Sequence, residues 1–516
     1  MAAIEHDAAR PAARRGFSAI DATAGLLIVL SVYLVLHMAL RIWASPLIGK
    51  NDVQEAVSAQ AWLLGYHPRN PPLHTWLVMG AYAVFGPTTL AHVVLKHVLL
   101  GAAYVFAYLC GREVLSTPKA AFVAAVSLTL LGPFAWTVHT ALTHTLLLAV
   151  AVLAALWTAM RLSARRRLID YIVFGLAMGF GFLAKYSFSL FFVALVAAMM
   201  SVRDLRRTLM DWRILASLAA ALIVFAPHGL WMLGARFDFV AFLAEKQRTA
   251  DVVRPYAGDV GRGLGNIALG ALTFTAPMVL TAPFVLWRLR GAPPAAPSSA
   301  WGRALGRICL AGLTILVLDV FVLRATEFEL RYFTCALLAA PMAAAYWIDQ
   351  RNGGGGAWRV VLVSVALVTL VGVGGVIGKA LWDQQSCDRC WDEMRADRLE
   401  DALRTEGFTR GTIVADHYNL AGNLRLAFPN ARIVAANYEV GLPRQSAEGM
   451  CVLAWNARTA GDALPADLTA YARQTGLAPL LPQPRYVEGL LRRSATRMDR
   501  FGYMIVTGAD GACRPR

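Results

Sequence analysis

The chain has 516 residues, of which 57% are hydrophobic and only 16% are charged, and its formal net charge is +16 at pH 7. Soluble globular proteins carry about 25% charged residues, so this composition excludes an ordinary soluble protein. The positive charge does not indicate nucleic-acid binding, because the basic residues cluster in short stretches between apolar runs. This distribution is typical of a membrane protein with many spans.

Apolar runs follow one another from residue 22 to residue 380. A helix needs about 20 apolar residues to cross the hydrocarbon core of a bilayer. The predicted fold class is therefore an all-α polytopic membrane protein with a small α/β domain at its carboxyl end. We predict about eleven spans, at residues 22–43, 89–111, 119–133, 135–160, 169–184, 187–201, 213–234, 264–288, 304–324, 331–349 and 358–380.

Basic residues occur in every second loop, including residues 161–167, 203–207 and 288–307, whereas the loops between are longer or more acidic. Since basic loops stay in the cytoplasm, the amino terminus is predicted to be cytoplasmic and the carboxyl terminus external. The amino-terminal tail has no convincing cleavage site and is predicted to be retained.

Three segments are external under this topology: residues 44–88, 235–263 and 381–516. In the first of these, an amphipathic helix at 52–65 and an apolar helix at 72–85 are expected to lie along the membrane surface. The third segment is long enough to form a domain of its own.

This last segment is predicted to be a small α/β domain. Three apolar runs, at 411–418, 431–438 and 451–456, are typical of short buried strands, and residues 419–428 between the first two are typical of a helix. An even number of cysteines in an oxidising space favours at least one disulfide, and a zinc site at the CDRC stretch is the weaker alternative. The four cysteines are Cys387, Cys390, Cys451 and Cys513.

Ionisable residues gather at the predicted external ends of the spans. Charged groups in a bilayer are costly and commonly mark function. Asp52 and Glu55 are three residues apart and share one face of the predicted loop helix. The others are His139, His144, Lys185, His228, Asp319, Arg324, Glu327, Glu329 and Arg331. Together they predict a polar cavity that opens outward.

Several of these residues have ordinary structural alternatives. Asp52 suits the N-cap of its helix, and Lys185 and Arg331 suit interface anchors that extend to the headgroups. His139 and His144 are five residues apart, which does not place two ligands on one helical face. We therefore predict no metal site and no obligate cofactor, and we assign no function to His92 and Lys96 in the second span.

A carboxylate beside cationic groups at the outer membrane surface suits group transfer from a lipid phosphate. The carboxylate is expected to take a proton from an acceptor hydroxyl as general base. The lysine and arginine side chains are expected to stabilise the phosphate that departs from the donor.

The stretch NDVQEA…WLLGYHPRNPPLHTWLVMGAYAVFG, at residues 51–86, resembles the first periplasmic loop of the GT-C glycosyltransferases related to protein O-mannosyltransferases and lipid A aminoarabinose transferases. GLAMGFGFLAKYSFSLFF (175–192) and LRYFTCALLAAPMAAA (330–345) resemble two further motifs of that family, and the similarity covers residues 20–380 in order. The resemblance implies a polyprenyl-phosphate-linked sugar as donor.

The resemblance also implies roles for single residues. Asp52 matches the family's catalytic acidic residue, and Glu55 matches a nearby polar position of the same helix. Lys185 and Arg331 match basic positions at the lipid-phosphate site, with Tyr332 next to Arg331. The other predicted substrate-binding residues are His144, His139, Arg69, Asn70 and His74.

Two departures from the family pattern leave the donor sugar, the acceptor and metal dependence open. Thr143–His144 stands where many members have an acidic residue in a PD-x-x-L motif, and Arg69–Asn70 stands where many have Glu-Lys or Asp-His before the two prolines. His144 either replaces a carboxylate as an acceptor ligand or lines the cavity.

The sequence thus predicts an inverting glycosyltransferase of a bacterial inner membrane, with Asp52 as general base and an envelope glycolipid or polysaccharide as acceptor. Residues 1–380 are the expected catalytic membrane domain, and residues 381–516 the expected periplasmic domain. The main alternative is a transporter or lipid flippase, whose inverted repeats and paired helix breaks are not evident in the sequence. A polymer ligase or a non-catalytic assembly scaffold is a third hypothesis.

Overall fold

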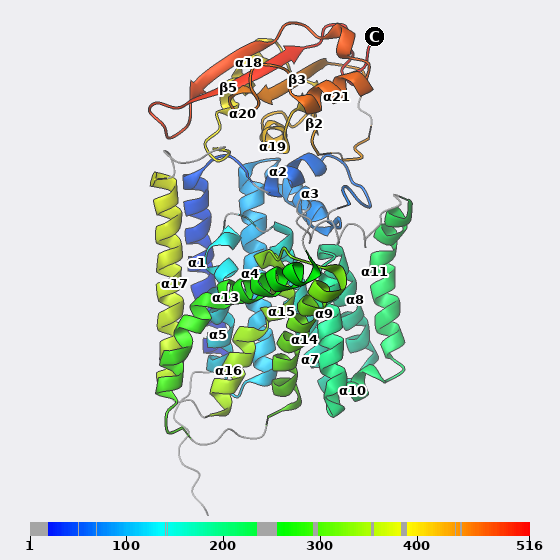
Figure 1. The fold of residues 1–516 in the computed structure, drawn as a ribbon. Helices are drawn as coiled ribbons and strands as arrows, with labels where there is room; N and C mark the ends of the chain where they lie inside the picture. Colours follow the sequence, from blue (N-terminus) through cyan, green and yellow to red (C-terminus); the bar gives the residue numbers. More distant parts are fainter. Residues whose placement is uncertain are drawn as a thin grey trace, which may run out of the picture.

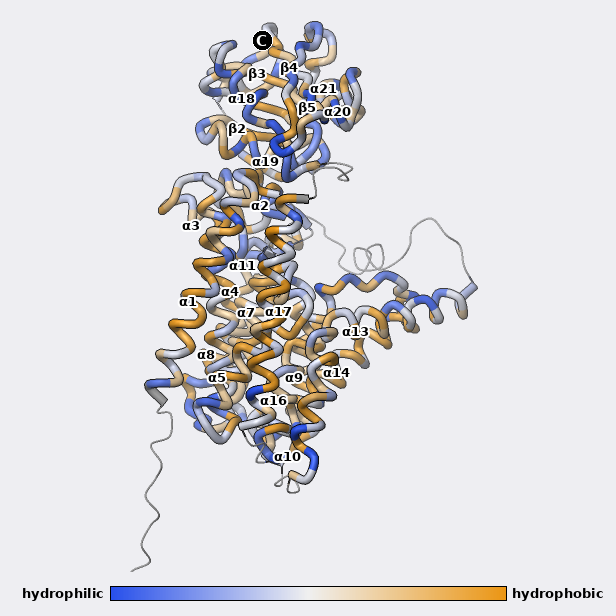
Figure 2. Tube along the Cα trace, turned by 90° about the vertical axis from the view of Figure 1, so that its left-hand side faces the viewer, coloured by the Kyte–Doolittle hydropathy of each residue, from blue (hydrophilic) through white to orange (hydrophobic). Residues whose placement is uncertain are grey.

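The computed structural model describes residues 19–49, 51–68, 70–139, 141, 143–234, 255–292, 298–351, 355–382, 390–438, 440–443 and 446–516. Helices form an elongated bundle, and a small domain containing a β-sheet covers one end of it (Figure 1). We call this the capped end. Apolar residues dominate the bundle, whereas polar residues are frequent in the covering domain and at the opposite end (Figure 2).

Within the described residues, seven helices are long and apolar enough to cross a membrane. They are α1 (Ala19–Ala44), α4 (Thr89–Val114), α7 (Thr143–Arg165), α11 (Ile214–Gly234), α13 (Tyr256–Arg288), α14 (Ala300–Leu323) and α17 (Gly355–Trp382). The shorter helices of the bundle are α5 (Pro118–Val126), α6 (Gly132–Ala135), α8 (Leu168–Ala184), α9 (Phe188–Ser201), α10 (Arg203–Leu209), α15 (Phe333–Leu337) and α16 (Ala340–Gln350), with 3-10 turns η1 (Ser127–Leu130), η2 (Thr137–His139) and η3 (Leu330–Tyr332).

The bundle confirms the predicted polytopic all-α fold, but it does not establish the count of eleven spans. The fourth predicted span, 135–160, starts too early, because Pro133 opens a separate four-residue helix and regular α7 begins only at Thr143. The tenth, 331–349, is divided between α15 and α16, where Pro341 occupies the first turn of α16, the position that proline suits in a helix. The amino-terminal tail and most of the predicted external segment 235–263 lie outside the described residues.

The carboxyl-terminal part contains a five-stranded sheet in the order β2-β1-β3-β5-β4. The strands are β1 (Gly411–Ala415), β2 (Arg432–Ala435), β3 (Met450–Asn456), β4 (Arg485–Leu490) and β5 (Met498–Ile505). β1 pairs in parallel with β2 and β3, whereas β5 is antiparallel to β3 and β4. The predicted strand–helix–strand unit is therefore confirmed, with α19 (Tyr418–Ala427) between β1 and β2.

Helices cover both faces of this sheet. Apolar residues of α18 (Ala396–Thr405) and α19 pack on one face, and those of α21 (Ala466–Gln474) pack on the other; a fourth helix, α20 (Ala457–Ala460), follows β3. The predicted disulfide chemistry is also present, because Cys451 and Cys513 are joined at an S–S distance of 2.10 Å. Cys390 is disulfide-bonded as well, and Cys387 lies outside the described residues.

The sheet domain holds the first loop against the bundle. Helix α2 (Asn51–Ser58) packs on α19 so closely that a Cβ at Gly422 would lie 2.5 Å from Val53 Cβ. The Asn423 side chain donates to the Ile48 carbonyl and accepts from the Ile48 N–H, each at 3.1 Å. The position of α2 therefore depends on distant residues, since Ile48 and Asn423 are 375 positions apart in the chain.

The predicted helix at 52–65 is shorter than expected and ends at Ser58. The Gln60 side chain donates to the carbonyls of Val57 and Ile433 and accepts from the Ile433 N–H. It thus takes the Val57 carbonyl that a continuing helix would bond to the amide four residues on. Helix α3 (Leu73–Phe85) follows Pro71 and Pro72, close to the predicted 72–85.

We expect Gly422→Val to lower the melting temperature of the detergent-purified protein, because the new side chain overlaps Val53. Overpacking of this kind costs about 1–3 kcal/mol. Thermal unfolding measures the loss, with Gly441→Val as the matched control, since a Cβ at Gly441 meets no atom within 4 Å. Equal melting temperatures for the two variants would show that α19 does not constrain α2.

Candidate functional site

Two buried carboxylates of α2 face the bundle at its capped end. Asp52 is 5% exposed and Glu55 is 4% exposed. Val53 packs on the other side of the same helix, against α19. The three-residue spacing of Asp52 and Glu55 places both carboxylates on the side away from α19, as the sequence predicted.

Asp52 forms an ion pair with the second predicted span. Its Oδ2 lies 2.8 Å from Lys96 Nζ, and its Oδ1 lies 4.0 Å from Nδ1 of His92, both on α4. The Nε2 of His92 contacts the Tyr82 hydroxyl at 2.7 Å. Burial by itself raises the pKa of Asp52, but the attraction of Lys96 and His92 outweighs burial, so the pKa lies below its ordinary value. Asp52 is therefore ionised at neutral pH.

Glu55 is surrounded by three partners from α3 and α7. Its Oε1 lies 2.7 Å from His144 Nε2, while its Oε2 accepts from the Thr75 hydroxyl at 2.8 Å and lies 3.3 Å from His74 Nδ1. Burial again raises the pKa, but His144 and His74 together hold the pKa of Glu55 well below its ordinary value. The structure thus brings three predicted site residues, Glu55, His74 and His144, into contact.

A narrow cavity lies beside Asp52 and reaches His74, a partner of Glu55. Its polar lining residues are Asp52, His74, His92, Lys96 and Thr143. In this conformation it has no space for a water-sized molecule. A substrate atom can therefore reach Asp52 only after local rearrangement.

The two cationic residues predicted to bind phosphate, Lys185 and Arg331, lie across the start of α7 from Glu55. Lys185, directly after α8, donates to the Thr145 hydroxyl at 2.8 Å. Arg331 pairs with Glu329, and its guanidinium lies 5.7 Å from the centroid of the Tyr332 ring. Lys185 and Arg331 are close enough to act on each other electrostatically. Both are half-buried, so they form a cationic group next to the Glu55 cluster.

His139 belongs to a different group from His144. Its ring stacks on His37 with centroids 3.6 Å apart, its Nε2 contacts the Tyr33 hydroxyl at 2.8 Å, and His97 lies at a centroid distance of 5.9 Å. The separation follows from the break between η2 and α7, which directs His139 toward α1 and α4.

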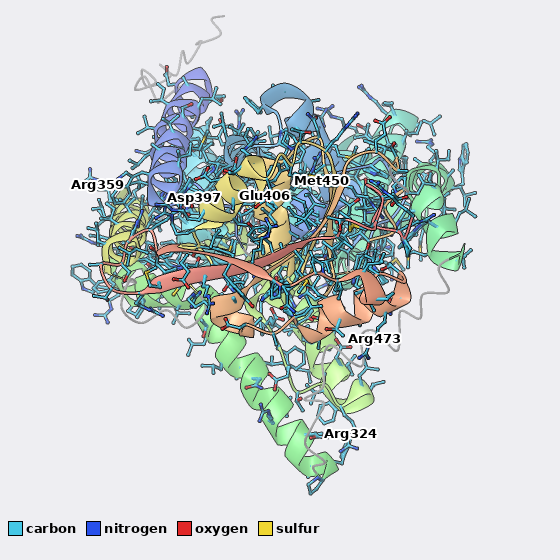
Figure 3. The ribbon with its side chains drawn as sticks, turned by 90° about the horizontal axis from the view of Figure 1, so that it is seen from above. Arg324, Arg359, Asp397, Glu406, Met450 and Arg473 are labelled. Carbon is cyan, nitrogen blue, oxygen red and sulfur yellow. A yellow bond between two sulfur atoms is a disulfide. The ribbon has the colours of Figure 1, made fainter. Side chains whose placement is uncertain are left out.

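Two other predicted residues, Asn70 and Arg324, have partners outside the Asp52 and Glu55 groups. The backbone N–H of Asn70 bonds to the carbonyl of His67 at 3.4 Å, and Arg69 lies outside the described residues. Arg324 pairs with Asp259 at 2.6 Å; viewed from above the sheet domain, it lies at the outlying tip of the molecule (Figure 3). Of the polar cavity predicted from the sequence, the part that remains is therefore the one formed by side chains of α2, α4 and α7.

A larger cavity lies between the ends of α1 and α17 and the sheet domain, with a volume of about 440 Å³. It is bordered by Asn51 and Gln54, which flank Asp52 on α2. Its lining includes three aromatic and three basic side chains, Trp136, Trp391, Tyr418, Arg41, Lys379 and Arg493, and also the acidic residues Asp392 and Glu393. Aromatic faces together with charged groups of both signs suit a polar ligand.

Sequence analysis missed Lys96 and His92, the two partners of Asp52. They are four residues apart in one predicted span and therefore share a helical face. Burying a lysine and a histidine on one face of an apolar helix costs free energy unless an anionic partner is present. The pair could therefore have indicated that a buried carboxylate lies opposite this face.

Comparison with known proteins finds that this chain is similar to glycosyltransferases. The family model described as dolichyl-phosphate-mannose-protein mannosyltransferase matches residues 69–231. Lipopolysaccharide core galacturonosyltransferase RgtA of Rhizobium johnstonii is 28% identical over 468 residues, which cover 86% of this chain and 89% of that protein. RgtB of the same organism, which has the same description, is 26% identical over 482 residues, with 93% and 96% covered.

The crystal structure of ArnT from Cupriavidus metallidurans bound to undecaprenyl phosphate superposes with a TM-score of 0.61 at 13% identity, covering 96% of this chain and 100% of that one. The chain is a glycosyltransferase with the GT-C fold. This family resemblance agrees with the one predicted from the loop at 51–86.

Proposed function

We propose that the chain transfers a sugar from a polyprenyl-phosphate-linked donor to a lipopolysaccharide-core or related glycolipid at the periplasmic face of a bacterial inner membrane. The names of the two Rhizobium relatives support this acceptor class and suggest a hexuronic acid as the sugar. The undecaprenyl phosphate named with the ArnT structure supports the donor class. The amino terminus is then cytoplasmic, and the capped end with the sheet domain is periplasmic.

The observation that carries the proposal is the buried ion pair between Asp52 of the first loop and Lys96 of α4. In the proposed step, an acceptor hydroxyl oxygen attacks C1 of the donor sugar while its proton passes to the Asp52 carboxylate. The bond between C1 and the phosphate oxygen breaks, and its electron pair leaves with the polyprenyl phosphate. Attack from the face opposite the phosphate inverts the configuration at C1. Asp52 then releases its proton to solvent, which its lowered pKa favours.

Lys185 and Arg331 are proposed to hold the donor phosphate. Their charges are half-buried and adjacent, so the departing phosphate gains charge-assisted bonds that water would weaken elsewhere. The aromatic and charged cavity beside Asn51 and Gln54 is proposed to take the acceptor sugar.

We expect Lys185→Ala and Arg331→Ala each to raise the KM for the phosphate-linked donor by about 10- to 100-fold, since a hydrogen bond to a charged group contributes roughly 1.5–3 kcal/mol. Steady-state kinetics with varied donor measures this effect. Arg262→Ala is the matched control, because Arg262 forms an exposed pair with Glu327. Unchanged donor KM in both test variants would remove the phosphate-site assignment.

The proposal as a whole is tested by mass spectrometry of envelope glycolipids from a wild-type strain, a deletion strain and the complemented strain. We expect one glycolipid to lose the mass of a single sugar in the deletion strain and to regain it on complementation. A difference of one hexuronic acid residue would identify the sugar class. Identical glycolipids in all three strains would contradict the proposed acceptor.

A further inference from the structure

Glu55, His74 and His144 form a compact cluster contributed by three separate elements, α2, α3 and α7. Each residue offers one ligand atom, and these three atoms lie within 4.8 Å of one another. All three side chains are buried, with exposed fractions of 3–4%. Such convergence of a carboxylate and two imidazoles requires an explanation beyond the pairing of a single charge.

The donor set is one that transition metals prefer. Two histidines and one glutamate make up a common three-ligand set of catalytic zinc sites, in which a fourth position stays open. Two ligand atoms of tetrahedral zinc lie roughly 3.3–3.5 Å apart, given Zn–N and Zn–O bonds of about 2.0–2.2 Å. The separation of His74 Nδ1 from Glu55 Oε2 is 3.3 Å, which already corresponds to that geometry. The His144 contact of 2.7 Å is shorter than this separation, so metal binding would require a rotation of that side chain.

Hydrogen bonding alone explains the cluster less well. One carboxylate balances one imidazolium, so one histidine must stay neutral in a site that water does not reach. The 3.3 Å contact of His74 is long for a charge-assisted bond, which is ordinarily about 2.7–2.9 Å. Asp52 does not supply the missing charge, because it is paired with Lys96.

We propose that Glu55, His74 and His144 bind a divalent transition-metal ion of the zinc type. His74 also lines the narrow cavity beside Asp52 and Lys96, so a bound ion would lie next to that pair, and a phosphate or water oxygen would reach it only after the same local rearrangement. If the ion also stabilises the donor phosphate, that role rests on the proposed function. Binding of the ion itself does not depend on the proposed function.

The test is metal analysis of the full-length protein, purified in detergent without metal-affinity resin or chelator. Inductively coupled plasma mass spectrometry is expected to find about one divalent ion per chain, as a three-ligand site implies. His144→Gln and Glu55→Gln are expected to lose the ion. His139→Gln is the matched control, because His139 is an equally buried histidine that lies in a separate cluster.

Thermal unfolding after chelation gives a second readout that does not depend on catalysis. Added Zn²⁺ is expected to raise the melting temperature of the wild type and of His139→Gln, because a ligand that binds the folded state stabilises it, and to leave His144→Gln unchanged. Equal metal content in the wild type and His144→Gln, or no zinc-dependent shift in the wild type, would overturn the proposal. Bound metal in a protein that transfers no sugar would overturn the proposed function and leave the metal site standing.

Discussion

Asp52→Asn is expected to lower sugar transfer by about 100- to 10,000-fold, the usual contribution of a general base. Asparagine keeps the size of the side chain and an oxygen for Lys96, but it cannot take the acceptor proton. Transfer by the purified protein from a polyprenyl-phosphate donor, followed by mass spectrometry of the product, measures the loss. Asp259→Asn is the matched control, since Asp259 is also ion-paired, with Arg324 at 2.6 Å, but far from α2 in the chain.

A loss of folding must be separated from a loss of chemistry, because Asp52→Asn leaves the Lys96 ammonium buried without a carboxylate. The double variant Asp52→Asn/Lys96→Met removes both charges, so it leaves no charge buried without its partner, which is the main cost of breaking a buried pair from one side. We expect this variant to melt near the wild-type temperature and to transfer no sugar. Transfer within about tenfold of wild type in either variant would exclude Asp52 as general base.

The elements that sequence analysis predicted well are those whose cause is local. An apolar run shows its length and hydropathy directly, so the polytopic all-α bundle was predicted, although only seven helices of the described residues are long and apolar enough to cross a membrane. The end of α2 and the start of α7 were not predicted correctly, because they depend on distant partners or on a proline. Gln60 ends α2 by bonding to Ile433, which is 373 positions away, and no local pattern contains that information.

The candidate site shows the same difference between features with a local cause and features that depend on distant residues. Asp52 and Glu55 were predicted to share a face because their spacing is a property of one helix. Their partners are at long range: Lys96 is 44 positions from Asp52, and His144 is 89 positions from Glu55. Only a fold can decide which cation meets which carboxylate. The motif resemblance placed the loop in a known family, but it did not predict the pairing with Lys96.

The contact between α2 and the sheet domain has a consequence for how the enzyme is organised. Val53, between the two carboxylates, meets Gly422, so the domain at the end of the chain sets the position of the proposed catalytic base. The contacts of this domain indicate that one of its tasks is to hold the first loop in place.

Lys96→Met is expected to destabilise the protein by about 3–5 kcal/mol near neutral pH, the usual cost of breaking a buried ion pair from one side. The side chains of Lys96 and Asp52 are 5% and 7% exposed, so water cannot replace the lost ammonium. Thermal unfolding in detergent measures the effect. Lys379→Met is the matched control, because its pair with Asp392 is roughly half exposed and such surface pairs contribute about 0–1 kcal/mol.

In Lys96→Met, the contribution of Asp52 to the pH dependence of stability is expected to have the opposite sign to that in the wild type. In the wild type the pKa of Asp52 is lowered, so its contribution to stability is present above the pKa of the unfolded chain and is lost as the pH falls through the folded pKa. Without Lys96 the effect of burial dominates and raises the pKa of Asp52 above that of the unfolded chain. The folded variant then binds the proton more tightly than the unfolded chain, and its stability falls as the pH rises through this range.

Melting curves across the acidic range for the wild type, Lys96→Met and Asp52→Asn/Lys96→Met separate this effect from general loss of packing. The double variant has no titrating group at position 52, so we expect its stability to lack the falling slope of Lys96→Met. A packing defect alone would shift the Lys96→Met curve downward by the same amount at every pH. Parallel curves for the wild type and Lys96→Met would therefore show that Lys96 does not control the ionisation of Asp52, and the proposed base would lose the partner that keeps it charged.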